Sequence, residues 1–275
     1  MKTLNELKIS PLVAVVDIET LSTQPNAAIV SIGCVIVNLF TQETVDEFYR
    51  VTDTYYQAIY NRDAMPSTVR WWEEQKETNP AAWKEYEKSN SIKESGQFEL
   101  ALIEFNNFLI KHFVDPSTIQ LMGNGCDFDN VILQTAFKKV LFSPSWEFSG
   151  NQSLRTAVWL GRLILGIDPK YDIPFEGTKH HALHDARHEA KVLLNIFHAF
   201  LCLEKPTPTW EEAPDNFKWR ARNADGSWLY FMNKPQRYGL VWRDGGDMVF
   251  GSPSTQLKPT PGWEFSLEQR PEVAA

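Results

Sequence analysis

Val13-Ala14-Val15-Val16-Asp17-Ile18-Glu19-Thr20 is the stretch that decides the fold. A short continuous run of apolar residues predicts a buried strand, and this run ends in two carboxylates one residue apart. Side chains alternate between the two faces of a strand, so Asp17 and Glu19 share one face at its end. Two acids held together repel each other unless a cation or a raised pKa relieves the repulsion. The pair therefore indicates half of a metal site, whereas the plainer interpretation is an acidic strand end in water.

Two further strands and a tryptophan-rich helical region follow this stretch. A turn containing Pro25 leads to an apolar run over residues 28–38, and residues 44–51 alternate well enough for a third strand. Short connections of this kind predict an antiparallel meander. A helix is expected from Pro66, another over residues 102–109, and a short strand over residues 118–122. We interpret Trp71, Trp72 and Trp83 as core or groove-wall aromatics, with base stacking as the alternative.

A second acidic segment follows the strand at 118–122. It reads Gly123-Asn124-Gly125-Cys126-Asp127-Phe128-Asp129-Asn130 and runs into apolar residues at helical spacing, so a helix is expected to begin near Asp127. Asp127 would be its N-cap. A dinucleotide-binding fingerprint is excluded because it needs glycine where Phe128 stands. Asp129 falls in the first turn, where the helix dipole favours a carboxylate that can also face a cleft. By itself it fits a structural role as well as a functional one.

After a helix expected over residues 153–165, with Ser153 as its cap, a histidine-rich segment opens a long helix that continues to about Leu203. Residues 179–190 read K-H-H-A-L-H-D-A-R-H-E-A. His184 and His188 are four residues apart, which raises a structural zinc site, but no cysteine pair or suitably spaced histidine completes one. A solvated histidine-rich helix face is the alternative for these two residues.

Together the three motifs resemble those of the DEDDh superfamily of 3′-5′ exonucleases. D-I-E at the strand end, N-x-x-x-F-D from Asn124 to Asp129 and H-x-x-x-x-D from His180 to Asp185 follow the order and approximate spacing of that superfamily. The resemblance covers residues 11–203. It implies an α/β, RNase H-like fold: a mixed five-stranded sheet flanked by helices, with the first strand central. The D-I-E-T-L-S-T-Q-P-N-A-A-I-V-S-I-G run and the V-R-W-W-E-E-Q helix also resemble the phage and prophage branch typified by the DexA-type exonuclease.

The acids suit hydrolysis of a phosphodiester bond with two Mg²⁺ or Mn²⁺ ions. Such chemistry needs a generated hydroxide, neutralisation of charge and help for the leaving 3′-oxygen, which two divalent ions about 3.5–4 Å apart provide. These ions prefer oxygen ligands. The expected metal ligands are Asp17, Glu19, Asp129 and Asp185, with Asp17 bridging both ions and Glu19 binding one ion or orienting the water. His180 completes the expected catalytic set, because a neutral imidazole can take the proton of the attacking water.

The resemblance also implies contacts to substrate. Thr20 and Leu21 are expected to approach the terminal nucleotide, and Asn124 is expected to contact substrate. The doublet His180-His181 leaves open which imidazole faces the site, although register with Asp185 favours His180.

Composition is that of an ordinary globular protein. Of 275 residues, 43% are apolar and 23% charged. No apolar run approaches the roughly 18 residues of a membrane span, and the first residues lack the apolar core of a signal peptide, so we expect a cytoplasmic protein without a membrane partner. Cys34, Cys126 and Cys202 lack metal-ligand spacing and are expected to be reduced, mostly buried thiols. A net charge of −8 argues against a nonspecific nucleic-acid coat protein, whose affinity rests on Lys and Arg.

The composition changes beyond Glu204. Pro206 and Pro208 predict a linker between an exonuclease domain, residues 1–205, and a small β module, residues 206–275, that holds five of the ten tryptophans. Two hairpins are expected there, one with its turn at 224–227 and one that joins residues 239–242 to 248–250. The tryptophans would form the core of the module, or one or two would form a stacking platform for single strands.

Two classes of function remain open. All four acids and the histidine are present, which favours an active, metal-dependent 3′-5′ exonuclease over a catalytically silent nucleic-acid-binding protein of the same fold. The enzyme would release nucleoside monophosphates from the 3′ end of a single strand. The residues do not distinguish DNA from RNA, because that choice depends on how the site treats a 2′-hydroxyl. The phage-type resemblance favours single-stranded DNA, and the alternative is an exoribonuclease that trims RNA 3′ ends.

Overall fold

The computed structural model describes residues 4–91, 95–140, 142–201, 209–224, 226–244, 250–251 and 266–271. The chain divides into two compact units, Met1–Phe197 and His198–Ala275. The linker predicted at Pro206 and Pro208 lies outside the described residues, so the boundary near residue 205 stays a prediction. Within the described chain, every helix is too short or too polar to cross a membrane.

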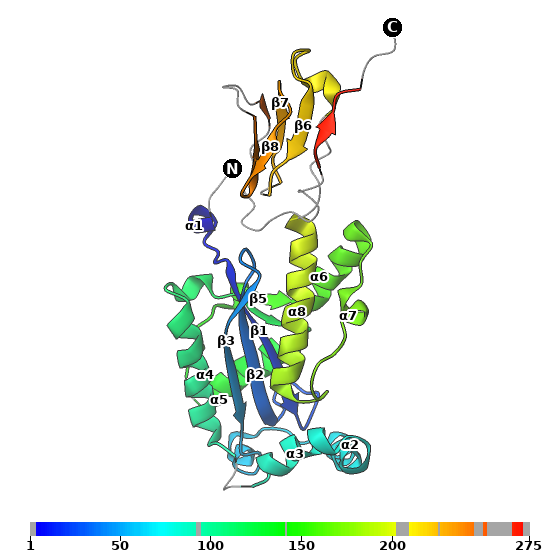
Figure 1. Ribbon diagram of the computed structural model, residues 1–275. Helices are drawn as coiled ribbons and strands as arrows, with labels where there is room; N and C mark the ends of the chain where they lie inside the picture. The colour runs from blue at the N-terminus through cyan, green and yellow to red at the C-terminus, as the bar shows by residue number, and fades with distance from the viewer. Residues whose placement is uncertain are drawn as a thin grey trace. The chain divides into compact units, whose positions relative to one another are not determined.

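A five-stranded sheet with the order β3-β2-β1-β4-β5 forms the centre of the first unit (Figure 1). The first strand along the chain, β1 (Leu12–Thr20), is central. On one side it pairs antiparallel with β2 (Ile29–Asn38), which pairs antiparallel with β3 (Glu43–Val51). On its other side lie the parallel strands β4 (Leu121–Gly123) and β5 (Asn151–Ser153). The predicted mixed sheet with its antiparallel meander is therefore confirmed.

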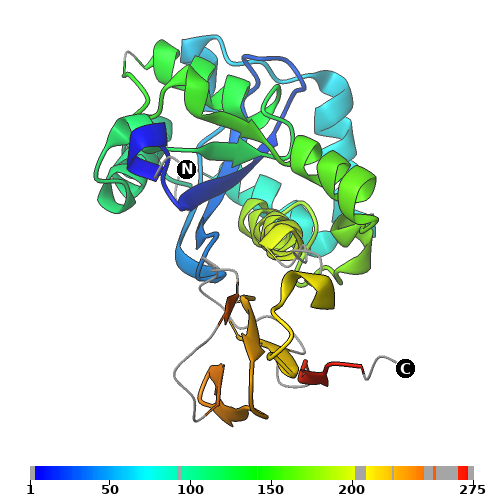
Figure 2. The same ribbon diagram turned by 90° about the horizontal axis from the view of Figure 1, so that it is seen from above.

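Helices cover both faces of this sheet. On one face, Ala14, Val16 and Ile18 of β1 join a core formed with α4 (Phe98–His112) and α5 (Asp129–Lys139). The other face is covered by α8 (Ala182–Leu201). In the view from above, the yellow-green α8 and the teal α4 lie on opposite sides of the blue strands (Figure 2). Because side chains alternate along β1, Asp17 and Glu19 point to the α8 face.

A glycine allows α8 to approach the sheet closely. Gly33 on β2 is the register partner of Asp17, and a Cβ at Gly33 would lie 2.2 Å from the carbonyl carbon of Ala182. Real Cβ atoms do not approach other heavy atoms so closely, so the first turn of α8 packs against β2 only because residue 33 is glycine. The residues just before and after Ala182 are thereby brought beside the end of β1.

The remaining helices of the first unit surround this centre. They are α1 (Leu4–Leu7), α2 (Pro66–Thr78), α3 (Pro80–Ser89), α6 (Leu154–Leu160), the π-helical turn η4 (Gly161–Leu165), α7 (Pro169–Asp172) and the 3₁₀ turns η1 (Tyr56–Tyr60), η2 (Pro116–Thr118) and η3 (Phe148–Gly150). Trp72 is buried and Trp71 and Trp83 half-buried in one cluster formed largely by α2 and α3, as expected of core or groove-wall aromatics.

One predicted helix start needs correction, and a second is confirmed in position only. The helix α5 begins at Asp129 with Phe128 at its N-cap, and not near Asp127, because a hydrogen bond from Phe128 N to Gly125 O (2.8 Å) closes a turn there. Ser153 occupies the N-cap position of α6 as predicted, but its side chain makes no capping bond. Its hydroxyl instead lies 3.4 Å from the backbone oxygen of Asn124.

The second unit is built from short antiparallel strands. A four-stranded sheet has the order β10-β7-β6-β11, and β8 pairs with β9. The elements are η5 (Trp210–Glu212), β6 (Trp219–Arg222), β7 (Trp228–Phe231), β8 (Gln236–Tyr238), β9 (Val241–Arg243), β10 (Phe250–Gly251) and β11 (Glu268–Gln269). Trp228 and Trp242 are buried, so both serve the core of this unit. Trp263 lies outside the described residues.

One of the two predicted hairpins is confirmed and the other is wrong. β6 and β7 pair around the turn predicted at 224–227. The strand 241–243, however, pairs with β8, which precedes it in the chain, and Phe250 pairs with Tyr230 of β7. The reason is Gly239, whose φ of +61° allows a two-residue turn after β8.

Candidate active site

The four acids of the three motifs meet at one end of the central strand. Asp17 and Glu19 come from β1, Asp129 from the first turn of α5 and Asp185 from the first turn of α8. One carboxylate oxygen from each of Asp17, Glu19 and Asp185 lies within 4.8 Å of the other two. Asp129 adjoins them, because its Oδ1 accepts a hydrogen bond from the backbone N of Ile18, at 3.3 Å. The structure therefore brings together all four acids that the motifs singled out.

Burial raises the pKa of each of these acids. For Asp17 and Glu19 burial is the main cause, repulsion by neighbouring carboxylates adds to it, and both pKa values lie well above the ordinary range. Burial raises the pKa of Asp129 to about 7, although hydrogen bonds from backbone amides oppose the shift. It raises the pKa of Asp185 to about 6. Carboxylates in such surroundings hold protons or bind a cation.

The donor atoms suit a hard divalent cation. The clustered ligand atoms are carboxylate oxygens, which Mg²⁺ and Mn²⁺ prefer. Oδ2 of Asp17 is buried and has no hydrogen-bond partner within the described part of the chain, so one buried oxygen is available for such an ion. The residues present therefore fit the divalent metal that the sequence predicts.

His180 lies at the open side of the acids. Its Nδ1 is 3.9 Å from Oε1 of Glu19, and its side chain is 46% exposed. The ring meets the edge of Trp71, with ring centroids 4.8 Å apart. Burial, with a smaller contribution from the charge of Lys179, lowers the pKa of His180, which favours the neutral ring near pH 7. Its φ of +62° is rare for a residue with a side chain and is typical of strained functional positions.

His181 points into the protein instead. Its Nε2 lies 3.4 Å from Oε1 of the buried Glu85, and its ring stacks on Tyr49 and on His184. Its backbone N donates a hydrogen bond to Oδ2 of Asp185, at 3.1 Å. Of the two adjacent imidazoles, His180 is thus the one beside Glu19, which is the arrangement that the register with Asp185 favours.

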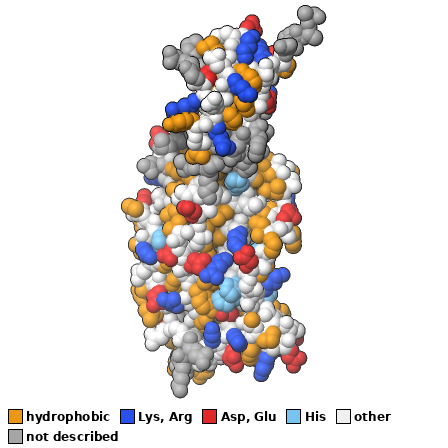
Figure 3. All heavy atoms as spheres, in the orientation of Figure 1, with side chains coloured by type: hydrophobic (Ala, Val, Ile, Leu, Met, Phe, Trp, Pro, Cys, Tyr) orange, Lys and Arg blue, Asp and Glu red, His pale blue; other side chains and the backbone are white. Residues whose placement is uncertain are grey.

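The other two histidines of the segment were expected to form a solvated helix face if they did not bind zinc, and the structure shows them less exposed than that. His184 and His188 are half-buried, and Nδ1 of His184 accepts a hydrogen bond from Thr178 N, at 3.0 Å. Histidine side chains are nevertheless visible at the surface over the first turns of α8, between acidic and basic side chains (Figure 3).

The three predicted substrate contacts lie in different surroundings. The side chains of Thr20 and Leu21 are mostly covered, at 8% and 6% exposure. The Thr20 hydroxyl donates to Ser22 O (2.8 Å), and Leu21 packs in the cluster of Trp72. Asn124, in contrast, lines a cavity beside the acids. The roles of all three toward substrate stay predictions.

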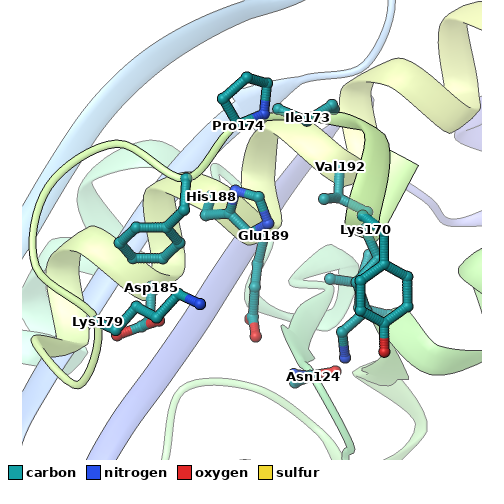
Figure 4. Close-up of a pocket in the computed structure, with 12 residues that line it drawn as sticks. Asn124, Lys170, Ile173, Pro174, Lys179, Asp185, His188, Glu189 and Val192 are labelled. Atoms are coloured by element: carbon teal, nitrogen blue, oxygen red, sulfur yellow. The ribbon is translucent and has the colours of Figure 1, made fainter. Parts of the chain in front are cut away.

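This cavity has a volume of about 390 Å³ and lies between α7, α8 and the loop that joins them (Figure 4). Asp185 and Asn124 line it together with Lys170 and Lys179. Backbone hydrogen bonds from His181 and His180, and then the charge of Lys179, oppose the rise in the pKa of Asp185 that burial causes. The cavity therefore combines the acids with two cations that can contact a phosphate.

Sequence reasoning missed one acid of this cavity, Glu189. It lies one helical turn after Asp185 and is only 7% exposed. Burial and the charges of Asp129 and Asp185 raise its pKa well above the ordinary range. The spacing of four residues from Asp185 was the available signal, because residues four apart share one face of a helix.

The sequence model of one protein family matches residues 13–197, and that family is described as the 3′-5′ exoribonuclease Rv2179c-like domain. No curated protein sequence matches the chain.

One solved structure shows the same fold at low identity, and two others show weaker similarity. The chain is similar to cell-death related nuclease 4 (CRN-4), with a TM-score of 0.50 and 15% identity over 68% of this chain and 64% of that one, so it spans less than two thirds of that relative. The nuclease domain of 3′hExo, a DEDDh family member bound to rAMP, matches with a TM-score of 0.49 and 12% identity over 68% and 92% of the two chains. Exonuclease I of E. coli in complex with a dT13 oligonucleotide matches with a TM-score of 0.48 and 11% identity over 80% and 51%. The predicted RNase H-like fold is confirmed.

Proposed function

Because the chain belongs to the family of 3′-5′ exoribonuclease Rv2179c-like domains, we propose that it hydrolyses RNA from the 3′ end and releases nucleoside 5′-monophosphates. The observation that carries this proposal is the convergence of Asp17, Glu19, Asp129 and Asp185 at the end of β1, with His180 at the open side. The family description favours RNA over the single-stranded DNA that the phage-type resemblance led us to expect.

The acids would divide between two metal positions. Asp17, Glu19 and Asp185 would hold one divalent ion, since their ligand atoms lie together. Asp129 would share a second position with Asp17. When bound, the two ions neutralise the charge that develops on the phosphate and on the leaving oxygen during an in-line displacement.

His180 and Glu19 would act on the attacking water. The 3.9 Å between His180 Nδ1 and Glu19 Oε1 is too long for a direct hydrogen bond, so a water can contact both groups. The lowered pKa of His180 keeps its ring neutral near pH 7, and the ring nitrogen that faces Glu19 then accepts the proton. Water attacks phosphorus, and the P–O3′ bond breaks. Its electron pair leaves with the 3′-oxygen of the shortened strand, which takes a proton from solvent.

Lys170 and Lys179 support the binding of a strand. The chain carries a net charge of −8, which repels a polyanion at long range. Both lysines line the cavity beside Asp185, so the surface next to the acids carries local positive charge. We assign them to phosphates of the RNA.

One degradation assay tests the reaction and the substrate class together. RNA and DNA strands of the same sequence, each labelled at the 5′ end, are incubated with Mg²⁺ or Mn²⁺, and the products are resolved by length. We expect RNA to shorten stepwise from the 3′ end. Asp185→Asn, prepared in the same way, controls for a contaminating nuclease.

The outcomes separate the substrate classes. Faster shortening of DNA would contradict the RNA assignment and would support the phage and prophage branch, which stays a prediction. Fragments that retain the label but end at internal positions from the start would indicate an endonuclease. Binding of both strands without cleavage would indicate the catalytically silent alternative.

A further inference from the structure

We propose that Glu189 is a fifth carboxylate ligand of the active site and completes the position of the second divalent ion. The inference rests on the proposed function, because it assumes that two ions bind among the acids.

Glu189 is a buried acid with an oxygen that nothing satisfies. Its side chain is more than nine-tenths buried, and Oε2 has no hydrogen-bond partner among the described residues. The Asn124 side chain donates a hydrogen bond to the carboxylate but leaves this oxygen free. A buried polar atom without a partner is destabilising, and the cost is larger for a charged group. A ligand that binds Oε2 would remove this cost.

The carboxylate points into the cavity beside the other acids. Figure 4 shows Glu189 extending from α8 toward Asn124, with Asp185 on one side and Lys170 on the other. Among the acids that raise the pKa of Asp17, Glu189 has the largest influence, ahead of Glu19. Oδ2 of Asp17 is also buried and without a partner. Two buried, unpartnered carboxylate oxygens therefore belong to neighbouring acids, and the charge of Glu189 adds to the effect of burial on the pKa of Asp17.

The neighbours of Glu189 place it at the second ion. Asp17, Glu19 and Asp185 already supply the ligand atoms that lie within 4.8 Å of one another. Glu189 is not one of these three, and its carboxylate points toward Asn124 (Figure 4). Asn124 follows Gly123, and a Cβ at Gly123 would lie 2.7 Å from Oδ2 of Asp129, so Glu189 extends toward the segment that carries Asp129. An ion held only by Asp17 and Asp129 would have few protein ligands, and a third carboxylate strengthens it.

Lys170 does not account for the buried charge by itself. Its positive charge opposes the rise in the pKa of Glu189, yet that pKa still lies well above the ordinary range. Within the described chain, no ion pair of 4.0 Å or less joins Lys170 to Glu189. The competing explanation is a protonated, purely structural Glu189 that is held by Asn124. Glu189→Gln distinguishes the two, because glutamine keeps the shape and the acceptor for Asn124 but binds Mn²⁺ poorly.

The experiment counts Mn²⁺ ions bound to the metal-free protein by electron paramagnetic resonance. We expect the wild type to bind two ions, and Glu189→Gln to keep the first and to bind the second at least about tenfold more weakly. Asp129→Asn should weaken the same ion. Glu176→Gln is the matched control, because it removes the same charge from a side chain that is 76% exposed and paired with Lys191. Both ions should remain in that variant.

The outcomes separate this inference from the proposed function. If Glu189→Gln binds two ions with wild-type affinity while the wild type degrades RNA, Glu189 is structural and only the inference is overturned. If the wild type binds no pair of ions, the two-ion mechanism fails and the inference fails with it. Circular dichroism checks the fold of the variant. Should glutamine prevent folding, Glu189→Asp moves the carboxylate back by one CH₂, and an unchanged second affinity there overturns the inference.

Discussion

The two faces of β1 differ in what they contribute. On one face, Ala14, Val16 and Ile18 are at most 4% exposed and stabilise the fold by removing apolar surface from water. On the other, Asp17 and Glu19 are held near further acids, where burial and repulsion raise their pKa values. The acidic face therefore lowers the free energy of unfolding of the metal-free protein, and the packing of the apolar face behind it holds the acids in place. Substitutions on the two faces should accordingly separate activity from stability.

Asp17→Asn should have the largest effect on activity. The ions that Asp17 would help to hold supply several kcal/mol of transition-state stabilisation, and each 1.36 kcal/mol is tenfold in rate. We expect RNA hydrolysis to fall by at least about 10³-fold. The metal-free variant should unfold at a higher temperature than the wild type, because a buried carboxylate that repels its neighbours is gone.

Asp46→Asn is the control for Asp17→Asn. Asp46 lies on β3 and is paired with Lys111 and His112. The substitution removes the same charge outside the site, and a surface ion pair of this kind contributes about 0–1 kcal/mol to the free energy of unfolding. Near-normal hydrolysis by Asp17→Asn in Mg²⁺ would rule out the division of the acids between two ions.

His180→Ala should lower turnover by about 10²–10⁴-fold, the usual contribution of a positioned base, while Mn²⁺ binding survives. Wild-type activity should rise with pH through the pKa of His180, which lies below its ordinary value, because only the neutral ring accepts a proton. His181→Ala should reduce turnover much less. It should lower stability, because Glu85 is buried and loses a partner. A larger loss of turnover in His181→Ala would reverse the assignment of the two imidazoles.

The pH dependence of stability tests the acidic face as a whole. Asp129 and Asp185 have folded-state pKa values of about 7 and about 6, above their unfolded values, so they bind protons more tightly when folded. Their contribution to stability is present below about pH 4 and is lost as the pH rises through 6 and 7. We expect the metal-free Tm to fall by on the order of 10 °C between pH 5 and 8, since a pKa difference of one corresponds to about 1.4 kcal/mol.

Mg²⁺ provides the control for this titration. At pH 8 the ions should replace the protons and restore most of the lost Tm. A metal-free protein that becomes more stable from pH 5 to 8 would mean that the acids ionise without repulsion, and the contrast between the two faces of β1 would not hold.

The sequence predicts the contrast on β1 because the signal is local. Alternation over eight residues is enough to place Asp17 and Glu19 on one face, and helical spacing is enough to place Asp185 on a helix, although that helix begins at Ala182 and not at the histidine doublet. β5 has no such signal. Its three residues, Asn151, Gln152 and Ser153, are polar, and they form a strand only by pairing with β4.

Glu189 shows the same limit within the site. Its place on one helix face with Asp185 is readable from the sequence, but the acids Asp17 and Asp129, whose charges interact with it, belong to other elements. The pairing of β9 with β8 likewise depends on the positive φ of Gly239, which the sequence allows without requiring. Long-range packing and a single backbone conformation decide these features.

Val16→Ala should have the smallest effect on activity, because Val16 lies on the apolar face of β1. Val16 is fully buried, and the residues before and after it along the strand point to the opposite, acidic face. Removing two buried carbons at about 0.8 kcal/mol each, with a further cost for the cavity, should lower the free energy of unfolding by about 2–3 kcal/mol. Urea unfolding measures this loss. At a temperature where the variant is folded, RNA hydrolysis and Mn²⁺ binding should stay within about twofold of the wild type, since 0.4 kcal/mol corresponds to a factor of two. A large loss of Mn²⁺ affinity in folded Val16→Ala would show that the apolar core sets the positions of Asp17 and Glu19 directly, so that the two faces cannot be varied independently.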